Sequence, residues 1–406
     1  MPGKSHPIVT PPELPLLGAL SKLEGEVDFS NTVLVGVQHL LASNISMLVK
    51  LREAGLDYER MFLLGKIYST NPEVATTLEE FGVFVHQSSC ELDRVSLLKD
   101  YHNQLGRAAD DLLATANRQL RVEPEPRKLL VIDDGATLIR SVNHHRECID
   151  ADVVAVEQTT SGAQVLKERP SILFPVINVA ESEAKRRHES PHVASSIIEN
   201  LENRIQALPL KTTLADVVAL IVGIGAVGME VAKRLKNKVA GLAVHDVNPE
   251  RLIAAQNAGF RVVDLREGLR RSHIVIGCVG KSWLPDDGAQ LIQDGTVLIN
   301  GSSSNIEFLG LNVLNGQGGA GFQLAHRNYP VKVQDGKAWV LNGGFPVNFD
   351  GSADPIPPLM IQFTRGLMLA GIYQAMASSP TERGLITLEE RRQDFLIGAA
   401  SNANII

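Results

Sequence analysis

The feature that most constrains the fold of this chain is a glycine-rich turn between a buried strand and an amphipathic helix. An apolar run at residues 217–222 predicts the strand. Three glycines follow it with the spacing G-x-G-x-x-G, namely Gly223, Gly225 and Gly228. A second apolar run at 239–244 ends at Asp246, eighteen residues past the last glycine. This order of strand, glycines, helix, strand and acid is the one that a dinucleotide-binding fold requires.

Each part of this stretch has a physical reason in a nucleotide site. The first glycine allows a tight turn, the second lets the backbone approach a pyrophosphate, and the third lets the helix pack on the strand. Ala226 and Val227 complete the turn, at the helix N-terminus that faces the phosphates. Asp246 is expected to bind the ribose hydroxyls and favours NAD over NADP, while Arg251 is the nearest cation that could weaken this preference. The alternative is a tight strand–helix turn in a Rossmann-like domain that binds no nucleotide.

Length and composition narrow the class of protein. The 406 residues exceed one ordinary core, so two domains are expected. A net charge of −7 without a basic run argues against nucleic acid as a partner, and no apolar stretch reaches membrane-spanning length. The cysteines and histidines show neither a disulfide framework nor a metal-ligand spacing, so no metal is expected. A cytoplasmic enzyme with a small-molecule substrate fits these totals best.

Strands that alternate with helices predict two doubly wound α/β domains with parallel sheets. We expect residues 1–195 to form the first part of a substrate domain, 196–350 an inserted Rossmann domain, and 351–406 a return to the substrate domain. Functional groups of such sheets gather beyond the carboxyl ends of the strands. Four polar residues follow predicted strands in this way, namely His39, Asp134, Gln158 and Asn178. A later loop of small residues, beginning with Gly301 and Ser302, could pass close to the nicotinamide.

A second informative stretch spans residues 174–190. Its apolar beginning predicts a strand, and a charged segment then places Lys185 and Glu189 one helical turn apart. On spacing alone, the two side chains form an ordinary ion pair on a solvated helix face. A catalytic role for either residue therefore needs support from the motifs around it.

Several further motifs occur in a fixed order along the chain. They are Val131-Ile-Asp-Asp-Gly135, Glu157-Gln-Thr-Thr-Ser-Gly162 and Asn178-Val-Ala-Glu-Ser-Glu-Ala-Lys185, followed after the glycine turn by Ile306-Glu307 and Val347-Asn348. The first three resemble the Asp-Asp-Gly, Glu-Glu-Thr-Thr-Thr-Gly and Asn-Val-Asn-Asp-Ser-x-x-Lys motifs of the S-adenosylhomocysteine hydrolase family. No single motif is decisive, but their shared order identifies the chain as a divergent member of that family.

The resemblance implies an NAD-dependent elimination. In that family NAD⁺ oxidises a ribose 3′-hydroxyl to a ketone, which acidifies the neighbouring 4′ hydrogen. A base removes that hydrogen and the 5′ thiolate leaves, after which water adds and the retained NADH reduces the ketone. The cofactor carries the redox step, and the protein positions the acids and bases. Family members are usually oligomers, so a homodimer or homotetramer is expected.

The resemblance also assigns roles residue by residue. Lys185 is the expected base at the oxidised hydroxyl, Asp134 the carboxylate near the 4′ and 5′ positions, and His39 the general acid/base near the leaving group. For His39 the alternative is a satisfied histidine at a strand end. Glu189 would hold a ribose hydroxyl, and Gln158, in place of a family glutamate, could still hydrogen-bond one. The remaining residues expected at or beside the cofactor are Thr159, Thr160, Ser161, Ser190 and Asn348.

The chain differs from the family at positions that contact the substrate in family members. Leu40, Leu41 and Ser43 stand where the family has polar residues that contact adenine. Asp354 stands near a family histidine, so that histidine is lost. The tail at 394–406 lacks the lysine–tyrosine segment with which family members close a neighbour's NAD site, so faster exchange of NAD is expected.

These observations lead to one hypothesis and three alternatives. We expect an NAD-dependent enzyme that oxidises a hydroxyl of a substrate other than S-adenosylhomocysteine, alone or followed by elimination, hydration and re-reduction. The alternatives are true S-adenosylhomocysteine hydrolysis, a plain dehydrogenase that releases NADH, and a catalytically silent NAD-binding paralogue.

Overall fold

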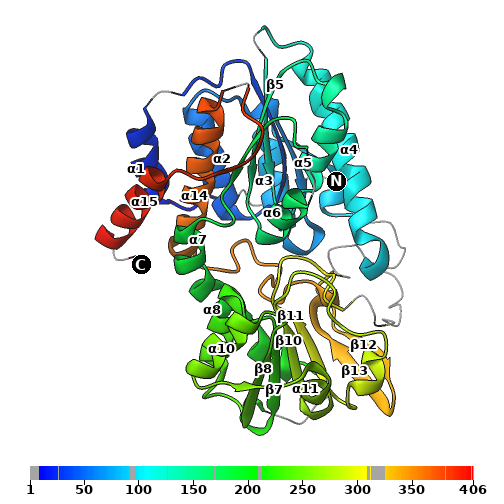
Figure 1. Ribbon diagram of the computed structural model, residues 1–406. Helices are drawn as coiled ribbons and strands as arrows, with labels where there is room; N and C mark the ends of the chain where they lie inside the picture. The colour runs from blue at the N-terminus through cyan, green and yellow to red at the C-terminus, as the bar shows by residue number, and fades with distance from the viewer. Residues whose placement is uncertain are drawn as a thin grey trace. The chain divides into compact units, whose positions relative to one another are not determined.

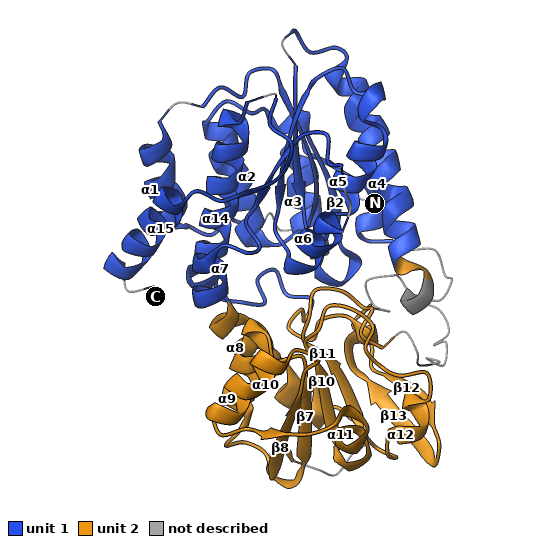
Figure 2. Ribbon diagram, viewed as in Figure 1, with its two compact units in different colours: residues 1–92, 102–189, 351–406 blue, residues 93–101, 190–350 orange. Residues whose placement is uncertain are grey.

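The computed structural model describes residues 9–405 (Figure 1), apart from 26, 92–96, 126, 169–170, 209–212, 309–310, 312–324, 380 and 404. The amphipathic pattern at 93–120 predicts a helix, whose first residues lie outside the described part. The chain divides into unit 1, residues 1–92, 102–189 and 351–406, and unit 2, residues 93–101 and 190–350 (Figure 2). The first division falls at 189/190 rather than at the expected 195/196, because a helix beginning at Ser190 packs entirely within unit 2.

Unit 1 is built on a seven-stranded parallel sheet with the order β14-β6-β5-β4-β1-β2-β3. Its strands are β1 (Thr32–Gln38), β2 (Met61–Gly65), β3 (Phe84–Val85), β4 (Lys128–Asp133), β5 (Asp152–Glu157), β6 (Pro175–Asn178) and β14 (Gly384–Thr387). Strand β14 was not expected from the sequence, because it is short, half-buried and defined by its pairing with β6. The strand order reverses direction between β4 and β1, so the carboxyl ends of these two strands flank the switch point.

The helices of unit 1 include several that the sequence did not predict. They are α1 (Pro15–Glu24), α2 (Ala42–Glu53), α3 (Pro72–Glu80), α4 (Leu97–Leu120), α5 (Thr137–His144), α6 (Thr160–Lys167), α7 (Glu183–His188), α14 (Pro358–Ala377) and α15 (Glu390–Asn402). The short helices α5 and α6 lack a long apolar period, so periodicity alone does not reveal them. Helix α14 packs on β4, β5 and β6 and also against α1, α2 and α15. From Gln362 to Met376 it is buried on all sides, which is why most of these residues are apolar.

Unit 2 has the strand order of a dinucleotide-binding fold. Its strands are β7 (Val218–Val222), β8 (Gly241–His245), β9 (Arg261–Val262), β10 (Ile274–Gly277), β11 (Val297–Asn300), β12 (Tyr329–Val333) and β13 (Gly336–Val340). The sheet runs β12-β13-β11-β10-β7-β8-β9. Counted from β7, and with β13 as the sixth strand, this is the order 3-2-1-4-5-6 read from the far edge. Strand β12 is antiparallel to β13, and the two form a hairpin that turns at Asp335-Gly336.

Both faces of the unit 2 sheet are covered by helices. These are α8 (Ser190–Gln206), α9 (Ala226–Leu235), α10 (Pro249–Asn257), α11 (Leu265–Arg271) and α12 (Gly288–Leu291). Strand β7 shows the consequence, because Ala219 and Ile221 join the apolar cluster under α8 and α9, whereas Leu220 and Val222 join the cluster under α11. A strand buried on both faces appears in sequence as a continuous apolar run, which is why β7 was predictable.

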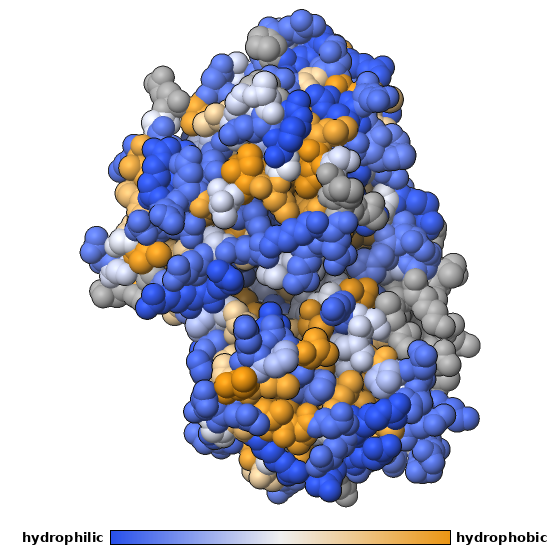
Figure 3. Space-filling model, viewed as in Figure 1, coloured by the Kyte–Doolittle hydropathy of each residue, from blue (hydrophilic) through white to orange (hydrophobic). Residues whose placement is uncertain are grey.

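The exterior is mainly polar in the view of Figure 3, where apolar side chains form smaller patches between charged ones. Within the described residues, no helix combines the length and the hydropathy needed to cross a bilayer.

Two helical glycines of unit 1 should respond oppositely to alanine. A Cβ at Gly371 of α14 would lie 2.7 Å from Val179 Cγ2, whereas nothing lies within 4 Å of one at Gly18 of α1. We expect Gly371→Ala to lower the free energy of unfolding by about 1–3 kcal/mol through overpacking. Gly18→Ala should raise it by roughly 0.5–1 kcal/mol, because alanine is the better helix former. Urea denaturation of both variants tests this, and equal effects of one sign would contradict the packing.

Candidate active site

The register of the unit 1 sheet gathers polar residues at one edge. Val37 of β1 is aligned with Asp133, Asp133 with Glu157, and Glu157 with Asn178. The residues that follow β1, β4 and β5 therefore leave the sheet side by side, at the carboxyl ends of the strands and next to the switch point. These following residues are His39, Asp134 and Gln158, three of the four strand-end residues singled out in the sequence.

Asp134 is the hub of this edge. Its side chain is 1% exposed and contacts three groups from three different strand ends. His39 Nε2 lies 2.9 Å from Asp134 Oδ2, and Gln158 Nε2 donates to the same oxygen at 3.1 Å. The buried ammonium of Lys66, which follows β2, pairs with Asp134 Oδ1. His39 Nδ1 is in turn 2.5 Å from Ser69 Oγ, so both ring nitrogens have partners.

These contacts separate the protonation states of the two central groups. Burial would raise the pKa of Asp134, but the charge of Lys66 and the contact with His39 overcome it and hold that pKa far below the ordinary value. Burial lowers the pKa of His39, and Lys66 and Arg365 lower it further against the opposing effect of Asp134. At neutral pH the site therefore holds an ionised Asp134 beside a neutral imidazole, and such an imidazole can accept a proton.

A second chain of contacts leads from Asp134 to the charged segment after β6. Lys185 Nζ donates to the Gln158 carbonyl oxygen at 2.5 Å and lies 3.7 Å from Glu189 Oε2. Thr364 of α14 donates to that same Glu189 oxygen at 2.7 Å. Lys185 and Glu189 thus form an i,i+4 pair, as the spacing predicted, but the two side chains are only 12% and 19% exposed and do not lie on a solvated helix face.

The residues beneath this edge are structural. Glu157 accepts hydrogen bonds from the backbone N–H groups of Gly135, Ala136 and Thr159 at 3.1, 2.8 and 2.7 Å. Burial raises the pKa of Glu157 to about 7, against these hydrogen bonds. The Thr159 hydroxyl donates to Glu157 and accepts from the Gly162 N–H at the start of α6. Thr159 therefore caps a helix, and the cofactor contact expected of it stays a prediction.

In unit 2 the three glycines of the turn have three different environments. A Cβ at Gly228 would lie 1.9 Å from the Gly223 carbonyl oxygen, and one at Gly223, whose φ is +91°, would lie 2.8 Å from the Cys278 oxygen. A Cβ at Gly225 would approach only Arg251 Nη1, at 3.9 Å. The first and third glycines are thus required by packing, while the second faces open space at the N-terminus of α9. This is the arrangement that a pyrophosphate needs.

Asp246 lies at the end of β8, beside the glycine turn. It is 6% exposed, and its Oδ2 accepts the Ile224 N–H at 2.7 Å, while Oδ1 accepts the Asn248 N–H at 2.8 Å. Each carboxylate oxygen keeps a lone pair that a ribose hydroxyl can use. Arg251 Nη1 is 3.5 Å from Asp246 Oδ2, so this cation faces the acid as the sequence suggested. The residues present therefore fit NAD.

The loops after β10 and β11 are held by their own hydrogen bonds. Glu307 accepts the Val279 and Gly280 N–H groups at 2.8 and 2.6 Å. Ser302 donates to Asn300 Oδ1 from its N–H and hydroxyl at 2.7 and 2.8 Å. The roles of the other expected cofactor contacts, Thr160, Ser161, Ser190, Gly301 and Asn348, stay predictions.

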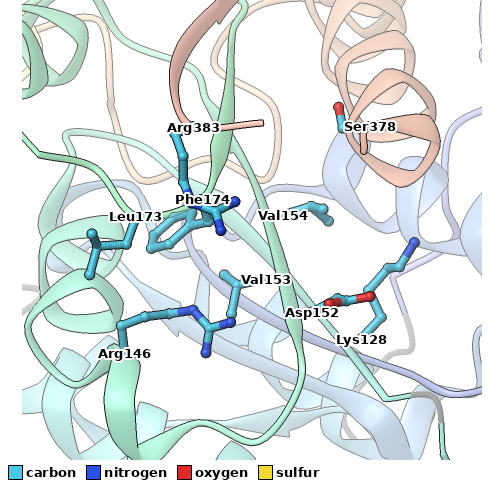
Figure 4. Close-up of a pocket in the computed structure, with 9 residues that line it drawn as sticks. All are labelled: Lys128, Arg146, Asp152, Val153, Val154, Leu173, Phe174, Ser378 and Arg383. Carbon is cyan, nitrogen blue, oxygen red and sulfur yellow. The ribbon is translucent and has the colours of Figure 1, made fainter. Parts of the chain in front are cut away.

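Other parts of the described structure offer no competing centre. No group of three or more metal-binding side chains occurs among the described residues. A small pocket is lined by residues that include Lys128, Asp152, Arg146 and Arg383 (Figure 4), and the first two begin β4 and β5. It therefore lies at the amino ends of these strands. Lys128 and Arg146 already donate to the backbone carbonyls of Met376, Ile149 and Ala151.

Sequence reasoning missed two cations of the site. Lys66 follows β2 just as His39 follows β1, so the strand-end rule could have found it. Arg365 lies inside the apolar helix α14, where a charged residue in an otherwise buried helix is itself a signal.

Comparisons with known proteins find one family profile over part of the chain and several distant relatives. Residues 196–351 match the family profile described as S-adenosyl-L-homocysteine hydrolase, NAD binding domain. An uncharacterized protein of Mycobacterium tuberculosis is 29% identical over 335 residues, which cover 80% of this chain and 60% of that protein. The adenosylhomocysteinase of a Nostoc species is 23% identical over 73% of this chain and 65% of its own. The S-inosyl-L-homocysteine hydrolase of Methanothermobacter thermautotrophicus is 26% identical over 50% of this chain and 48% of its own length. The chain thus spans about half to two thirds of the length of these relatives.

Removal of the Lys66 charge should raise the pKa of His39. In Lys66→Met the imidazole loses a positive neighbour that disfavours its protonation, so it should protonate at a higher pH than in the wild type. NMR titration of the histidine side chains measures this. Lys50→Met is the control, because Lys50 pairs with Glu53 in α2. An unchanged His39 titration in Lys66→Met would contradict the arrangement.

The glycine turn should separate folding from cofactor binding. Gly225→Ala should keep the Tm of the wild type but weaken NAD binding by at least about tenfold, because its methyl group projects toward the pyrophosphate. Gly228→Ala should lower the Tm as well, because no space exists for its methyl group. Calorimetric NAD titration and thermal unfolding test both, and wild-type affinity in Gly225→Ala would count against this site.

Proposed function

We propose that the chain is a divergent member of the S-adenosylhomocysteine hydrolase family, and that with NAD as its cofactor it oxidises a hydroxyl of a small-molecule substrate. The oxidation stands alone or is followed by elimination, hydration and re-reduction. The substrate is one other than S-adenosylhomocysteine. The observation that carries the proposal is the continuous chain of contacts from His39 through Asp134 and Gln158 to Lys185.

Bound NAD supplies the oxidising equivalent, and the residues of unit 1 handle the protons. Lys185 takes the proton of the substrate hydroxyl as the C–O bond becomes a carbonyl, and Glu189, 3.7 Å away, stabilises the resulting ammonium. A carbonyl acidifies the C–H bond on the neighbouring carbon. The ionised Asp134 accepts the Nε2–H of the neutral His39, which leaves Nδ1, 2.5 Å from the Ser69 hydroxyl oxygen, as the nitrogen that receives or returns a proton near a leaving group.

The surroundings of His39 support a changed substrate. Leu40 and Leu41 are buried at 0% and 5% exposure, and they are apolar where family members read adenine. The backbone N–H of Ser43 donates to Asp354 at 3.1 Å, and its hydroxyl accepts from Arg365 at 3.2 Å. A site whose polar partners are changed in this way discriminates strongly between related ligands. The relative named S-inosyl-L-homocysteine hydrolase makes an inosyl compound one candidate.

The test is to load the purified chain with NAD⁺ and to add S-adenosylhomocysteine, S-inosylhomocysteine and a panel of nucleosides and polyols. We expect absorbance of reduced nicotinamide with at least one compound other than S-adenosylhomocysteine. Lys185→Gln should slow this signal by about 100-fold or more. Lys167→Gln is the matched control, because Lys167 is an exposed lysine paired with Glu181 at 2.6 Å.

The other outcomes separate the alternatives. Thiol release from S-adenosylhomocysteine at turnover would make the proposed change of substrate wrong. Free NADH that accumulates in solution would indicate a plain dehydrogenase. Confirmed NAD binding without reduced nicotinamide from any compound would indicate a catalytically silent protein.

A further inference from the structure

Two arginines of unit 1 are buried to the same degree but are satisfied differently. Arg365 and Arg392 are each 2% exposed. Arg392 pairs with Glu24 at 2.7 Å and with Glu389, as a buried guanidinium is expected to do. Among the described residues, Arg365 makes a single hydrogen bond, from Nε to Ser43 Oγ at 3.2 Å, and no carboxylate oxygen lies within 4.0 Å of it. Four of its five N–H donors thus have no acceptor in the described part of the chain.

The carboxylates around Arg365 are neighbours whose oxygens are engaged elsewhere. Its charge interacts with Asp354, which precedes α14, with Glu189 at the end of α7, and with Asp134 after β4. Asp354 accepts a hydrogen bond from the Ser43 N–H. Glu189 accepts one from Thr364 and lies close to Lys185. Asp134 pairs with Lys66. Burial lowers the pKa of Arg365 to about 10, so the group remains a cation at neutral pH.

Three further polar atoms, on two amides at the carboxyl ends of strands of this sheet, also lack a partner among the described residues. Gln158 Oε1 is buried without a hydrogen bond, although Nε2 of the same amide donates to Asp134. Gln38, the last residue of β1, is 1% exposed, and neither atom of its amide has a partner. Buried polar atoms of this kind cost stability unless something completes their hydrogen bonds. They surround one edge of one sheet, which favours a ligand as the missing partner.

We propose that Arg365 is a specificity-determining residue, whose two terminal nitrogens bind a planar oxygen acceptor of the substrate, a carbonyl or a carboxylate. A guanidinium presents its N–H groups as a flat fork that matches such an acceptor, and it has no acceptor of its own for an amino group. The site therefore selects ligands that carry this oxygen against otherwise equal ligands that carry an amino or alcohol group in its place. The inference rests on the proposed function in one respect, namely that the ligand is the substrate of the same site.

The binding test uses two matched pairs of ligands and the NAD-loaded chain. Inosine and adenosine differ in an oxo or amino group at one ring position, and ribonate and ribitol differ in a carboxylate or an alcohol. By calorimetric titration we expect the oxygen-bearing member of one pair to bind at least about tenfold more tightly. A preference in the first pair identifies a carbonyl, and one in the second identifies a carboxylate. Arg365→Gln should abolish the preference, and Arg365→Lys should retain only part of it.

Two results overturn the proposal. One is the absence of a preference in both pairs, including the absence of binding. The other is a preference that survives in Arg365→Gln. Binding with the expected preference but without reduced nicotinamide would instead reject the proposed oxidation and leave the subsite intact, so the two failures are distinguishable.

The Tm of the ligand-free protein distinguishes a binding role from a structural one, because loss of a purely structural arginine lowers it. Arg392→Met should lower the Tm by several degrees, on the order of 5 °C, because it leaves two carboxylates without their partner. Arg365→Met should leave the Tm unchanged or raise it, because it removes a buried charge that no carboxylate pairs. An equal loss of Tm in both variants would make Arg365 structural and would overturn the proposal.

Discussion

The buried carboxylate of Asp134 is the group on which the polar site of unit 1 depends. A carboxylate that is 1% exposed is unfavourable unless cations and donors compensate for the lost hydration. Lys66, His39 and Gln158 supply that compensation, and each is delivered by a different strand end. The network therefore exists only when β2, β1, β4 and β5 are in register. The protonation states of Asp134 and His39 therefore depend on the correct pairing of these strands.

The two units offer different groups. Unit 2 offers backbone N–H groups at the start of α9 and a carboxylate, Asp246, fixed by the Ile224 N–H, which are the features that hold a dinucleotide. Unit 1 offers the neutral imidazole of His39, the ionised carboxylate of Asp134 and the side chains of Lys66 and Lys185 within one connected set of contacts. An NAD-dependent oxidation needs a cofactor site and a place to put the proton, and the chain has a group suited to each.

The hydrogen bonding around Arg365 differs from that around Asp134. Around Asp134 the carboxylate oxygens are matched to the donors of Lys66, His39 and Gln158, and only the Gln158 Oε1 atom of these groups is buried without a partner among the described residues. Around Arg365 the donors outnumber the acceptors of the described residues, whereas the terminal nitrogens of the equally buried Arg392 pair with the carboxylates of Glu24 and Glu389. Such an imbalance lowers stability and is retained where binding needs it. Substrate recognition is therefore expected to lie in α14 and the segment after His39.

The sequence by itself determined the features that depend on local pattern. The glycine turn, β7, the acid at residue 246 and the strand-end positions of His39 and Asp134 follow from residue type and short-range spacing, because a tight turn admits only glycine and a strand buried on both faces must be apolar. Only the tertiary structure decided that Lys66 pairs with Asp134, that Thr159 caps α6, that β14 completes the sheet, and that Arg365 pairs with no carboxylate of the described residues. Those facts depend on strand order and register, which bring together residues far apart in the chain, and no local pattern records them.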